Sequence, residues 1–216
     1  MSQLMDNLDT IASHIRQDFT AKDGAREKAL PLCREAIRYS GNTIRALHRQ
    51  EFDRAGEMLA KVGGLVAEAK KSIAACSELL NTGFLWNAQK EFTEGSITLA
   101  LITGQKLPGP DKLNVDYAAY LNGLAEAAGE IRRYLLDSMR KGDQSRGEEL
   151  LLAMNDIYDV LVTIDFPDAI TGGLRRNTDM VRGVLERTRS DLTLAVQQKR
   201  LENKLEKVTQ KTVKGG

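Results

Sequence analysis

The scarcity of proline and the spacing of apolar residues constrain the fold of this chain more than any other feature. Only Pro31, Pro108, Pro110 and Pro167 occur among its 216 residues. The segments between them are rich in Ala, Leu, Glu, Lys and Arg, and their apolar residues stand three and four positions apart. The pattern predicts an all-α protein, with helices at about 3–19, 22–48, 50–79, 83–103, 114–141, 144–164 and 168–206.

The connections between these segments are mostly short, which favours antiparallel neighbouring helices. The longest break is GQKLPGPDKLN at 104–114, where two prolines and two glycines predict a loop. We therefore expect one domain over residues 1–206, a seven-helix antiparallel bundle, followed by a flexible basic tail at 207–216. Pro31 either kinks its helix or marks its first turn. The pair Gly172-Gly173 indicates an irregularity at a helix start.

Charge and cysteine usage narrow the class of protein further. The formal net charge is +1 and the pI is near 7.7, so any nucleic-acid binding must depend on local basic patches. Cys33 and Cys76 both fall in helical stretches and are interpreted as reduced core thiols, with a disulfide the less favoured alternative. The N-terminal segment has no signal-peptide pattern, and no segment is long enough to span a membrane. We expect a cytoplasmic protein.

Two pairs of acidic residues are the main candidates for chemistry. Glu91 and Glu94 occur in QKEFTEG, and Glu126 and Glu130 occur in LNGLAEAAGEIRR. Residues three or four apart share one helix face, so the pairs could converge from neighbouring antiparallel helices. Four close carboxylates repel one another unless a cation neutralises them, and oxygen ligands suit a hard divalent cation. The alternative is a pair of solvated helix faces, because a chain with 30 acidic residues contains many such pairs.

The apolar stripes of the two helices predict where these acids point. The stripes consist of Leu85, Ala88, Phe92, Leu99 and Ile102 on one helix and Leu121, Leu124, Ala128, Ile131, Leu135 and Met139 on the other. The four acids and Thr98 lie well round from these stripes. A catalytic site there needs a second subunit to exclude water, whereas the alternative predicts plain solvent.

Other catalytic arrangements find little support in the sequence. His14 and His48 are the only histidines, they lie on different predicted helices, and neither belongs to a zinc or di-iron motif. An acid/base ribonuclease mechanism with these two histidines has no motif behind it. No phosphate-binding loop, dinucleotide fingerprint or nucleophile elbow is present. Trp86 could stack on bases, but an aromatic residue at helical spacing more often belongs to a core.

Two stretches resemble a known family. Residues 119–146, AYLNGLAEAAGEIRRYLLDSMRKGDQSR, resemble the translin signature, in which a Y-L-x-G-V/L helix leads through G/S-E-L-x-R to an N-S-V-x-x-G-D-x-S-R-like turn. QKEFTEG resembles the E-Y-V-E-A motif of the catalytic branch, translin-associated factor X (TRAX), and residues 25–49 resemble the long early helix of that branch. The likeness extends from about residue 10 to 200. The chain is identified as a member of the translin family, in the TRAX-like branch.

The resemblance implies an all-α, seven-helix protomer that assembles into a hollow octamer and binds single-stranded RNA or DNA inside. In the catalytic branch this assembly is a Mg²⁺-dependent endoribonuclease. Glu91 and Glu94 match the two acids of E-Y-V-E-A, Glu126 matches an aspartate, and Glu130 matches the glutamate of G-E-L. The resemblance assigns these four as catalytic, metal-binding residues for Mg²⁺ or Mn²⁺. With no second family member in view, we expect a homo-oligomer.

Three departures from the family pattern bear on activity. Glu126 carries one methylene more than the family's aspartate, which shifts the carboxylate relative to the strict octahedral demand of Mg²⁺. Ala119 precedes Tyr120 where the family has V-D-Y-L, whereas Val115-Asp116-Tyr117 recurs one turn earlier and leaves the role of this aspartate open. Gly95 replaces the alanine after the second acid and weakens its helix.

The predicted mechanism is metal-assisted hydrolysis of a phosphodiester that leaves a 5′-phosphate and a 3′-hydroxyl. Arg133, with Lys90 and Arg132 as weaker candidates, contacts nucleic-acid phosphates or serves only as a charge partner of the acids. Two other functions remain open. One is a non-catalytic RNA- or DNA-binding ring, and the other is a helical scaffold without nucleic acid.

Overall fold

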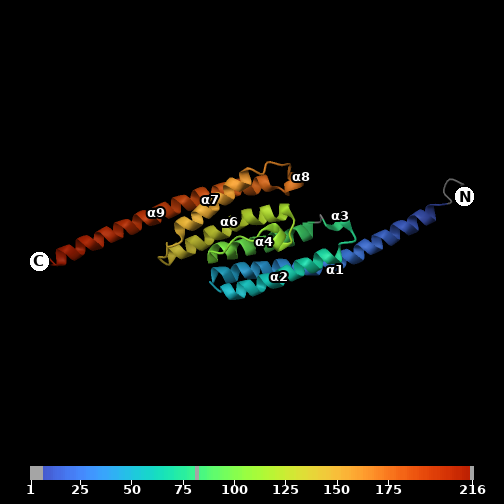
Figure 1. The fold of residues 1–216 in the computed structure, drawn as a ribbon, viewed down its shortest axis with the longest axis horizontal. Coiled ribbons are helices and arrows are strands. Elements are labelled where there is room, and N and C mark those ends of the chain that lie inside the picture. Colours follow the sequence, from blue (N-terminus) through green and yellow to red (C-terminus); the bar gives the residue numbers. More distant parts are fainter. Residues whose placement is uncertain (1–6, 81–82, 215–216) are drawn as a thin grey trace. The chain divides into compact units, whose positions relative to one another are not determined.

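The computed structural model describes residues 7–80 and 83–214, and the regular structure of these residues is entirely helical. The predicted all-α fold is confirmed. Six helices are long and three are single turns (Figure 1). They are α1 (Leu8–His48), α2 (Phe52–Ser72), α3 (Ser77–Leu80), α4 (Gly83–Thr103), α5 (Pro110–Leu113), α6 (Tyr117–Arg140), α7 (Gly147–Val162), α8 (Asp168–Thr171) and α9 (Leu174–Lys214).

The observed helices differ from the predicted ones mainly in α1. The sequence predicts two helices at 3–19 and 22–48, but α1 is continuous over 41 residues. The stretch at 20–21 contains neither proline nor glycine, so nothing there ends the helix. Pro31 lies inside α1 and removes one backbone hydrogen bond at a cost of about 3 kcal/mol. The buried side chains of Ala29, Cys33 and Ala36 on either side of it offset that cost.

Two glycines and a proline explain two further irregularities, the α8–α9 break and the single turn α5. Gly172 and Gly173 both have positive φ angles, 65° and 84°, and they separate α8 from α9. The predicted irregularity at this pair is confirmed. Pro110 occupies the first position of α5, a single turn within the predicted loop at 104–114. Helix α9 extends through Lys214, and the prediction that residues 207–216 are flexible stays a prediction.

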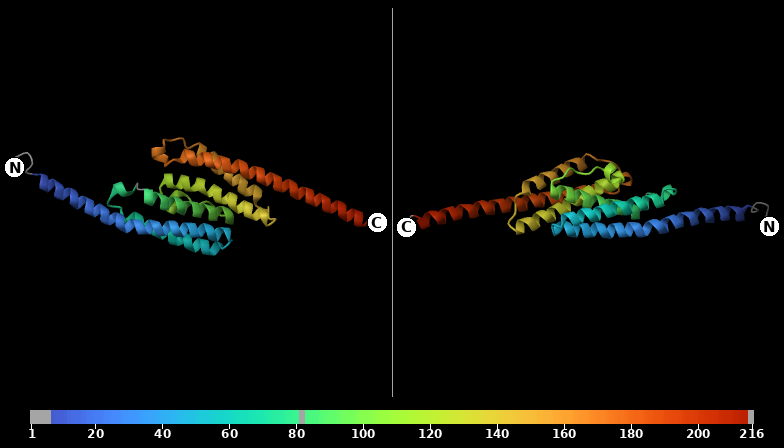
Figure 2. Two further views of the ribbon diagram at one scale, coloured as in Figure 1. Left: turned by 180° about the vertical axis from the view of Figure 1, so that it is seen from behind. Right: turned by 60° about the horizontal axis from the view of Figure 1, so that its bottom comes forward.

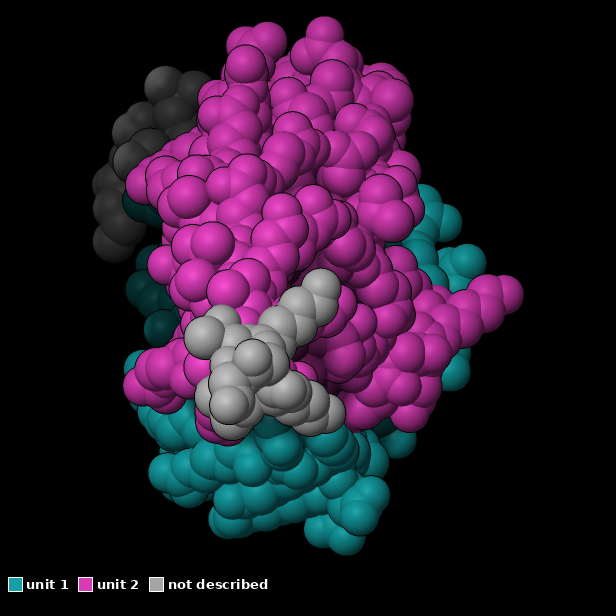
Figure 3. Space-filling model, turned by 90° about the vertical axis from the view of Figure 1, so that its left-hand side faces the viewer, with its two compact units in different colours: residues 1–96, 109–120 teal, residues 97–108, 121–216 magenta. Residues whose placement is uncertain are grey.

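The chain divides into two compact units, coloured separately in Figure 3. Unit 1 comprises Met1–Ser96 and Gly109–Tyr120, and unit 2 comprises Ile97–Pro108 and Leu121–Gly216. The boundary falls within α4 and within α6, so each of these helices contributes residues to both units. The single-domain organisation expected for residues 1–206 stays a prediction.

Unit 1 is built on α1 and α2, which pack side by side as a helical hairpin (Figures 1 and 2). The first part of α4 packs closely on this pair. A Cβ added to Gly63 of α2 would lie 3.1 Å from Phe92 Cζ, and one added to Gly95 would lie 3.1 Å from Leu59 Cδ2. Cys33 and Cys76 are buried, free thiols, as predicted. Burial raises the pKa of Cys33 to about 11, so its thiol stays protonated near neutral pH.

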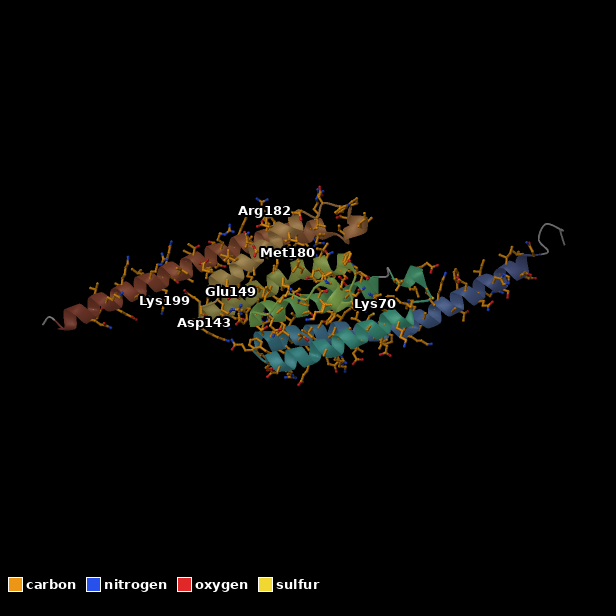
Figure 4. The ribbon with its side chains drawn as sticks, viewed as in Figure 1. Lys70, Asp143, Glu149, Met180, Arg182 and Lys199 are labelled. Carbon is orange, nitrogen blue, oxygen red and sulfur yellow. The ribbon has the colours of Figure 1, made fainter. Side chains whose placement is uncertain are left out.

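Unit 2 is built on α7 and α9, which pack along one another. Its buried apolar residues include Leu150, Met154, Ile157 and Leu161 of α7 and Val181, Leu185 and Leu192 of α9. Figure 4 labels Met180, Arg182 and Lys199 along α9. Among the helices of the described residues, none combines the length and apolar character needed to cross a membrane.

Candidate functional site

Glu91 and Glu94 lie on α4, a helix whose side chains are buried on most of its circumference. Four of its polar residues, Gln89, Thr93, Ser96 and Thr98, are buried together with its apolar ones. Thr98 was predicted to lie on an open polar face with the acids, and it is fully buried instead. Both acids are half-buried, and the Glu91 side chain is 30% exposed. Plain solvent exposure, the alternative left open by the sequence, does not describe this face.

Glu126 and Glu130 lie on α6 and are also half-buried, with the Glu130 side chain 22% exposed. The predicted apolar stripe of this helix is largely confirmed, because Leu124, Ala128, Ile131 and Leu135 are buried. Ala125 and Ala127, which flank Glu126, have no exposed surface. Glu126 therefore emerges from a tightly packed stretch of helix, which limits the conformations that its side chain can adopt.

The basic residues predicted for nucleic-acid binding have different partners. Lys90 is only 12% exposed, and its Nζ lies 3.6 Å from a carboxylate oxygen of Glu91. Arg133 is 59% exposed and lies 3.9 Å from Glu130. These two are charge partners of the acids. Arg132 instead donates hydrogen bonds to Thr188 Oγ1 at 3.1 Å and Asp191 Oδ2 at 2.7 Å, so it joins α6 to α9.

A hollow on the surface of α6 contains an arginine, Arg140, that was not among the predicted nucleic-acid-binding residues. It is lined by Gly129, Arg132, Arg133, Leu136, Asp137 and Arg140. Arg140 stands seven residues after Arg133, a spacing that places both on one face of the helix. That spacing was the available signal. The exposed arginines of this hollow present guanidinium donors, a chemistry that suits phosphate groups, beside the carboxylate pair of α6.

The start of α6 is attached to α4 within unit 1. Gln89 Nε2 donates a hydrogen bond to Asp116 Oδ2 at 2.9 Å, and Gln89 Oε1 accepts one from the Asp116 backbone N–H at 2.8 Å. Lys70, labelled in Figure 4, donates to the Asn114 carbonyl at 3.1 Å and lies 3.4 Å from Asp116 Oδ1. The Asp116 carbonyl in turn accepts a hydrogen bond from the Tyr120 N–H, and this is the first hydrogen bond of α6. We call Gln89, Asp116 and Lys70 the α6 clasp.

The end of α4 is attached to the turn after α6 within unit 2. Arg146 donates hydrogen bonds to the carbonyls of Leu101, at 3.1 Å, and Ile102 in the last turn of α4. A cation at this end of a helix satisfies unpaired carbonyls and complements the helix dipole. Asp143 Oδ1 accepts a hydrogen bond from the Ser145 N–H, and this bond orders the turn and lowers the pKa of Asp143. Figure 4 labels Asp143 and Glu149, the second partner of Arg146.

These contacts give the direction of the two acid-bearing helices. Gln89, near the start of α4, meets the first residues of α6, and the last turn of α4 meets the turn that follows α6. Helices α4 and α6 therefore run in the same direction, and not as the antiparallel neighbours expected from short loops. The connection at 104–116, with α5 inside it, is long enough to return the chain to its starting end.

The structure also explains the positions of the two histidines and the presence of Gly95. His14 and His48 lie on the single helix α1, 34 residues apart, which separates them by about 50 Å along the axis. They cannot act as one acid/base pair. Gly95, a departure from the family pattern, allows close packing, because a methyl group there would press on Leu59.

No family model matches the chain. An uncharacterized protein of Methanocaldococcus jannaschii is 30% identical over 207 residues, covering 94% of this chain and 89% of that relative.

Solved structures extend the likeness. The AfC3PO–duplex RNA complex is 32% identical, with a TM-score of 0.77 over 87% of this chain and 97% of that one. The crystal structure of AfC3PO is 30% identical over the same shares, with a TM-score of 0.76. Apo-NeC3PO, at 17% identity and a TM-score of 0.76 over 90% of this chain and all of that one, shares the fold. The chain belongs to the translin family, to which the C3PO proteins also belong.

Proposed function

We propose that the protein is a Mg²⁺-dependent endoribonuclease of the TRAX-like branch that cleaves single-stranded RNA. One observation carries the proposal: the chain aligns at 32% identity over nearly the whole length of a protein described in complex with RNA. The presence of an acid at all four positions that the family resemblance assigns to catalysis supports the nuclease branch. AfC3PO holds duplex RNA in its complex, so the preference for single strands must be tested against a duplex.

The donor groups of the four acids fit the proposed cation. Glu91, Glu94, Glu126 and Glu130 offer only carboxylate oxygens, which Mg²⁺ and Mn²⁺ prefer over softer ligands. All four are half-buried, so their charges are screened less by solvent than surface charges are. Glu91 and Glu94 would hold the cation from α4, and Glu126 and Glu130 would hold it from α6. No histidine or cysteine is needed.

Held by these four carboxylates, a divalent cation would supply activation of the attacking water and neutralisation of the scissile phosphate. The chain's own residues bind and orient the substrate. Arg133 and Arg140 contact phosphates of the RNA backbone from one face of α6, and Lys90 holds Glu91 in place. Arg132 acts through α9 and is a weaker candidate for an RNA contact. Hydrolysis leaves a 5′-phosphate and a 3′-hydroxyl.

The proposed assembly is a hollow homo-octamer located in the cytoplasm, with RNA bound inside. The C3PO neighbours support an assembly of this family type. The half-buried acids of each protomer would then face the enclosed space, where a neighbouring subunit limits access of bulk water. Single-stranded DNA is the second proposed ligand.

Cleavage of labelled single-stranded RNA by wild type, Glu126→Gln and Glu57→Gln tests the nuclease proposal. Glu57 is an exposed glutamate on α2, so it controls for the same chemical change elsewhere. We expect wild type and Glu57→Gln to cleave with Mg²⁺ and to stop with EDTA. Glu126→Gln should lose about 100-fold or more in rate. A wild type that binds the RNA but never cuts it would exclude the proposal.

The second candidate function is a non-catalytic RNA- or DNA-binding ring. It is favoured by the ion pairs of Glu91 with Lys90 and of Glu130 with Arg133, because these bases can neutralise two of the acids without a cation. Salt-dependent RNA binding without cleavage would support this alternative. Absence of any binding to single-stranded RNA, duplex RNA or single-stranded DNA would leave the scaffold interpretation.

A further inference from the structure

The Gln89 side chain is fully buried although its amide is polar. It has no exposed surface, and it lies on α4 two residues before Glu91. A buried amide without hydrogen-bond partners destabilises a fold, so the partners of Gln89 matter. Both of its polar atoms bond to one residue, Asp116, through the side chain at 2.9 Å and through the backbone N–H at 2.8 Å.

This two-point contact fixes more than the position of a side chain. Asp116 is the residue whose carbonyl accepts the first hydrogen bond of α6, from Tyr120 at 2.8 Å. A contact through the backbone N–H of that residue fixes where α6 begins, because sliding the helix would break the bond. Val115, immediately before it, is buried, and Lys70 anchors the preceding Asn114 carbonyl.

We propose that Gln89 and Asp116 are positioning residues for the candidate metal site. Within unit 1, the α6 clasp fixes where α6 begins against α4. Glu126 and Glu130 follow that start on the same helix, 10 and 14 residues after Asp116. This inference rests on the proposed function, since it assumes that the four acids share a cation. It gives a role to the Val115-Asp116-Tyr117 motif, which the family resemblance left without one.

A different role for Asp116 is electrostatic. Its negative charge could raise the affinity for a cation without any effect on register. The two roles make opposite predictions for variants that separate charge from hydrogen bonding. Asp116→Asn removes the charge but keeps an acceptor for Gln89. Gln89→Met keeps the charge but removes both hydrogen bonds at nearly the same side-chain volume. Asp116→Ala removes the charge and the side-chain acceptor together.

Mn²⁺ binding to the full-length protein, followed by electron paramagnetic resonance, measures the effect without relying on activity. If the clasp sets register, Gln89→Met and Asp116→Ala should weaken Mn²⁺ affinity about tenfold. Asp116→Asn should remain within about twofold of wild type, so the conservative variant restores what alanine loses. Two independent disruptive variants keep the test usable if one of them fails to fold.

Tyr39→Phe is the matched control within unit 1. It removes the 2.7 Å hydrogen bond from Lys61 to the Tyr39 hydroxyl between α1 and α2, and it leaves α4 and α6 untouched. Its Mn²⁺ affinity should equal that of wild type even if its melting temperature falls. A general loss of stability would instead lower Mn²⁺ affinity in all variants in proportion to their melting temperatures.

The outcomes separate this inference from the proposed function. If wild type binds Mn²⁺ and Gln89→Met binds it equally well, the clasp does not position the site, and the inference is overturned. If Asp116→Asn is as weak as Asp116→Ala, charge is the cause, and the inference is again overturned. If wild type binds no Mn²⁺, or Glu94→Gln binds it unchanged, the metal site itself fails, and the inference fails with it.

Discussion

The two parts of helix α4 are held in place by different physical means. In unit 1, its first part packs so closely on α2 that a methyl group added to Gly63 or Gly95 would come within 3.1 Å of a neighbouring side chain. In unit 2, its last turn is held by the Arg146 guanidinium on the Leu101 and Ile102 carbonyls. Gly104, with a φ of 69°, ends the helix there, and the Gln105 N–H bonds back to Ala100.

This difference teaches where each part is sensitive to mutation. Close packing tolerates the loss of polar groups but not the addition of atoms, because the interior has no free volume. A cationic cap tolerates added volume at its exposed side but not the loss of its hydrogen bonds. The candidate acids Glu91 and Glu94 therefore lie in the part of α4 whose packing depends on shape, beside Phe92 and Gly95.

Loss of the charged cap should have the largest effect. Arg146→Ala removes the guanidinium from the Leu101 and Ile102 carbonyls, of which Leu101 keeps the Gly104 N–H at 3.3 Å, and should lower the free energy of unfolding by about 2–3 kcal/mol. Glu149→Gln removes only the exposed ion pair of Arg146 and should cost less than about 1 kcal/mol. Urea denaturation of the three proteins measures both values. Equal losses in the two variants would show that the carbonyl contacts contribute nothing.

Neighbouring glycines of α2 test the shape-dependent contact. Gly63→Ala would place a methyl group 3.1 Å from Phe92 Cζ, whereas the position of a Cβ on Gly64 is open. Alanine favours the helix by about 1 kcal/mol at either position, so Gly64→Ala should stabilise the protein by about that amount. Gly63→Ala should be less stable than Gly64→Ala by about 1–2 kcal/mol, as measured by urea denaturation. Matching stabilities would mean that Phe92 moves freely.

Gly95→Ala should have a smaller effect, because the obstructing atom is the end of a flexible side chain. The added methyl group would meet Leu59 Cδ2 at 3.1 Å, and the helix-forming advantage of alanine offsets most of that strain. We expect a net loss of about 0.5 kcal/mol. The double variant Gly95→Ala, Leu59→Val should be more stable than the two single changes predict by addition, in a thermal double-mutant cycle. Additive values would contradict the close contact.

The smallest effect concerns pH. The Ser145 N–H lowers the pKa of Asp143 in the folded state. The stability that this contact contributes is therefore present above the unfolded pKa of about 4 and is lost as pH falls through the lower folded pKa. Asp143→Asn keeps the acceptor but cannot titrate, so its melting temperature should fall slightly less than that of wild type between pH 5 and pH 2. Parallel melting curves across that range would contradict this role.

Several structural features followed from local sequence. The all-α class came from helix-forming residues between rare prolines, and the break at Gly172-Gly173 came from backbone freedom that only glycine has. The apolar stripe of α6 was visible because that helix buries one face, so its 3.6-residue period appears in the sequence. The candidate acids, chosen by spacing and resemblance, were found half-buried on α4 and α6.

Other features depended on distant contacts that spacing does not encode. Helix α4 is buried around most of its circumference, so Thr98 did not reveal its burial through any period. The continuity of α1 through Pro31 depends on packing that outweighs a local cost. The shared direction of α4 and α6 depends on where the connection at 104–116 returns the chain.

The sequence alone determined the helical class, the family resemblance and the identity of four carboxylates, because each depends on residue type and short-range order. Only the tertiary structure decided that Gln89 meets Asp116 and that Arg146 meets the end of α4. These partners are 27 and about 45 positions apart in the chain. Hydrogen bonds across such separations form only when packing brings the groups together, and no local pattern announces them.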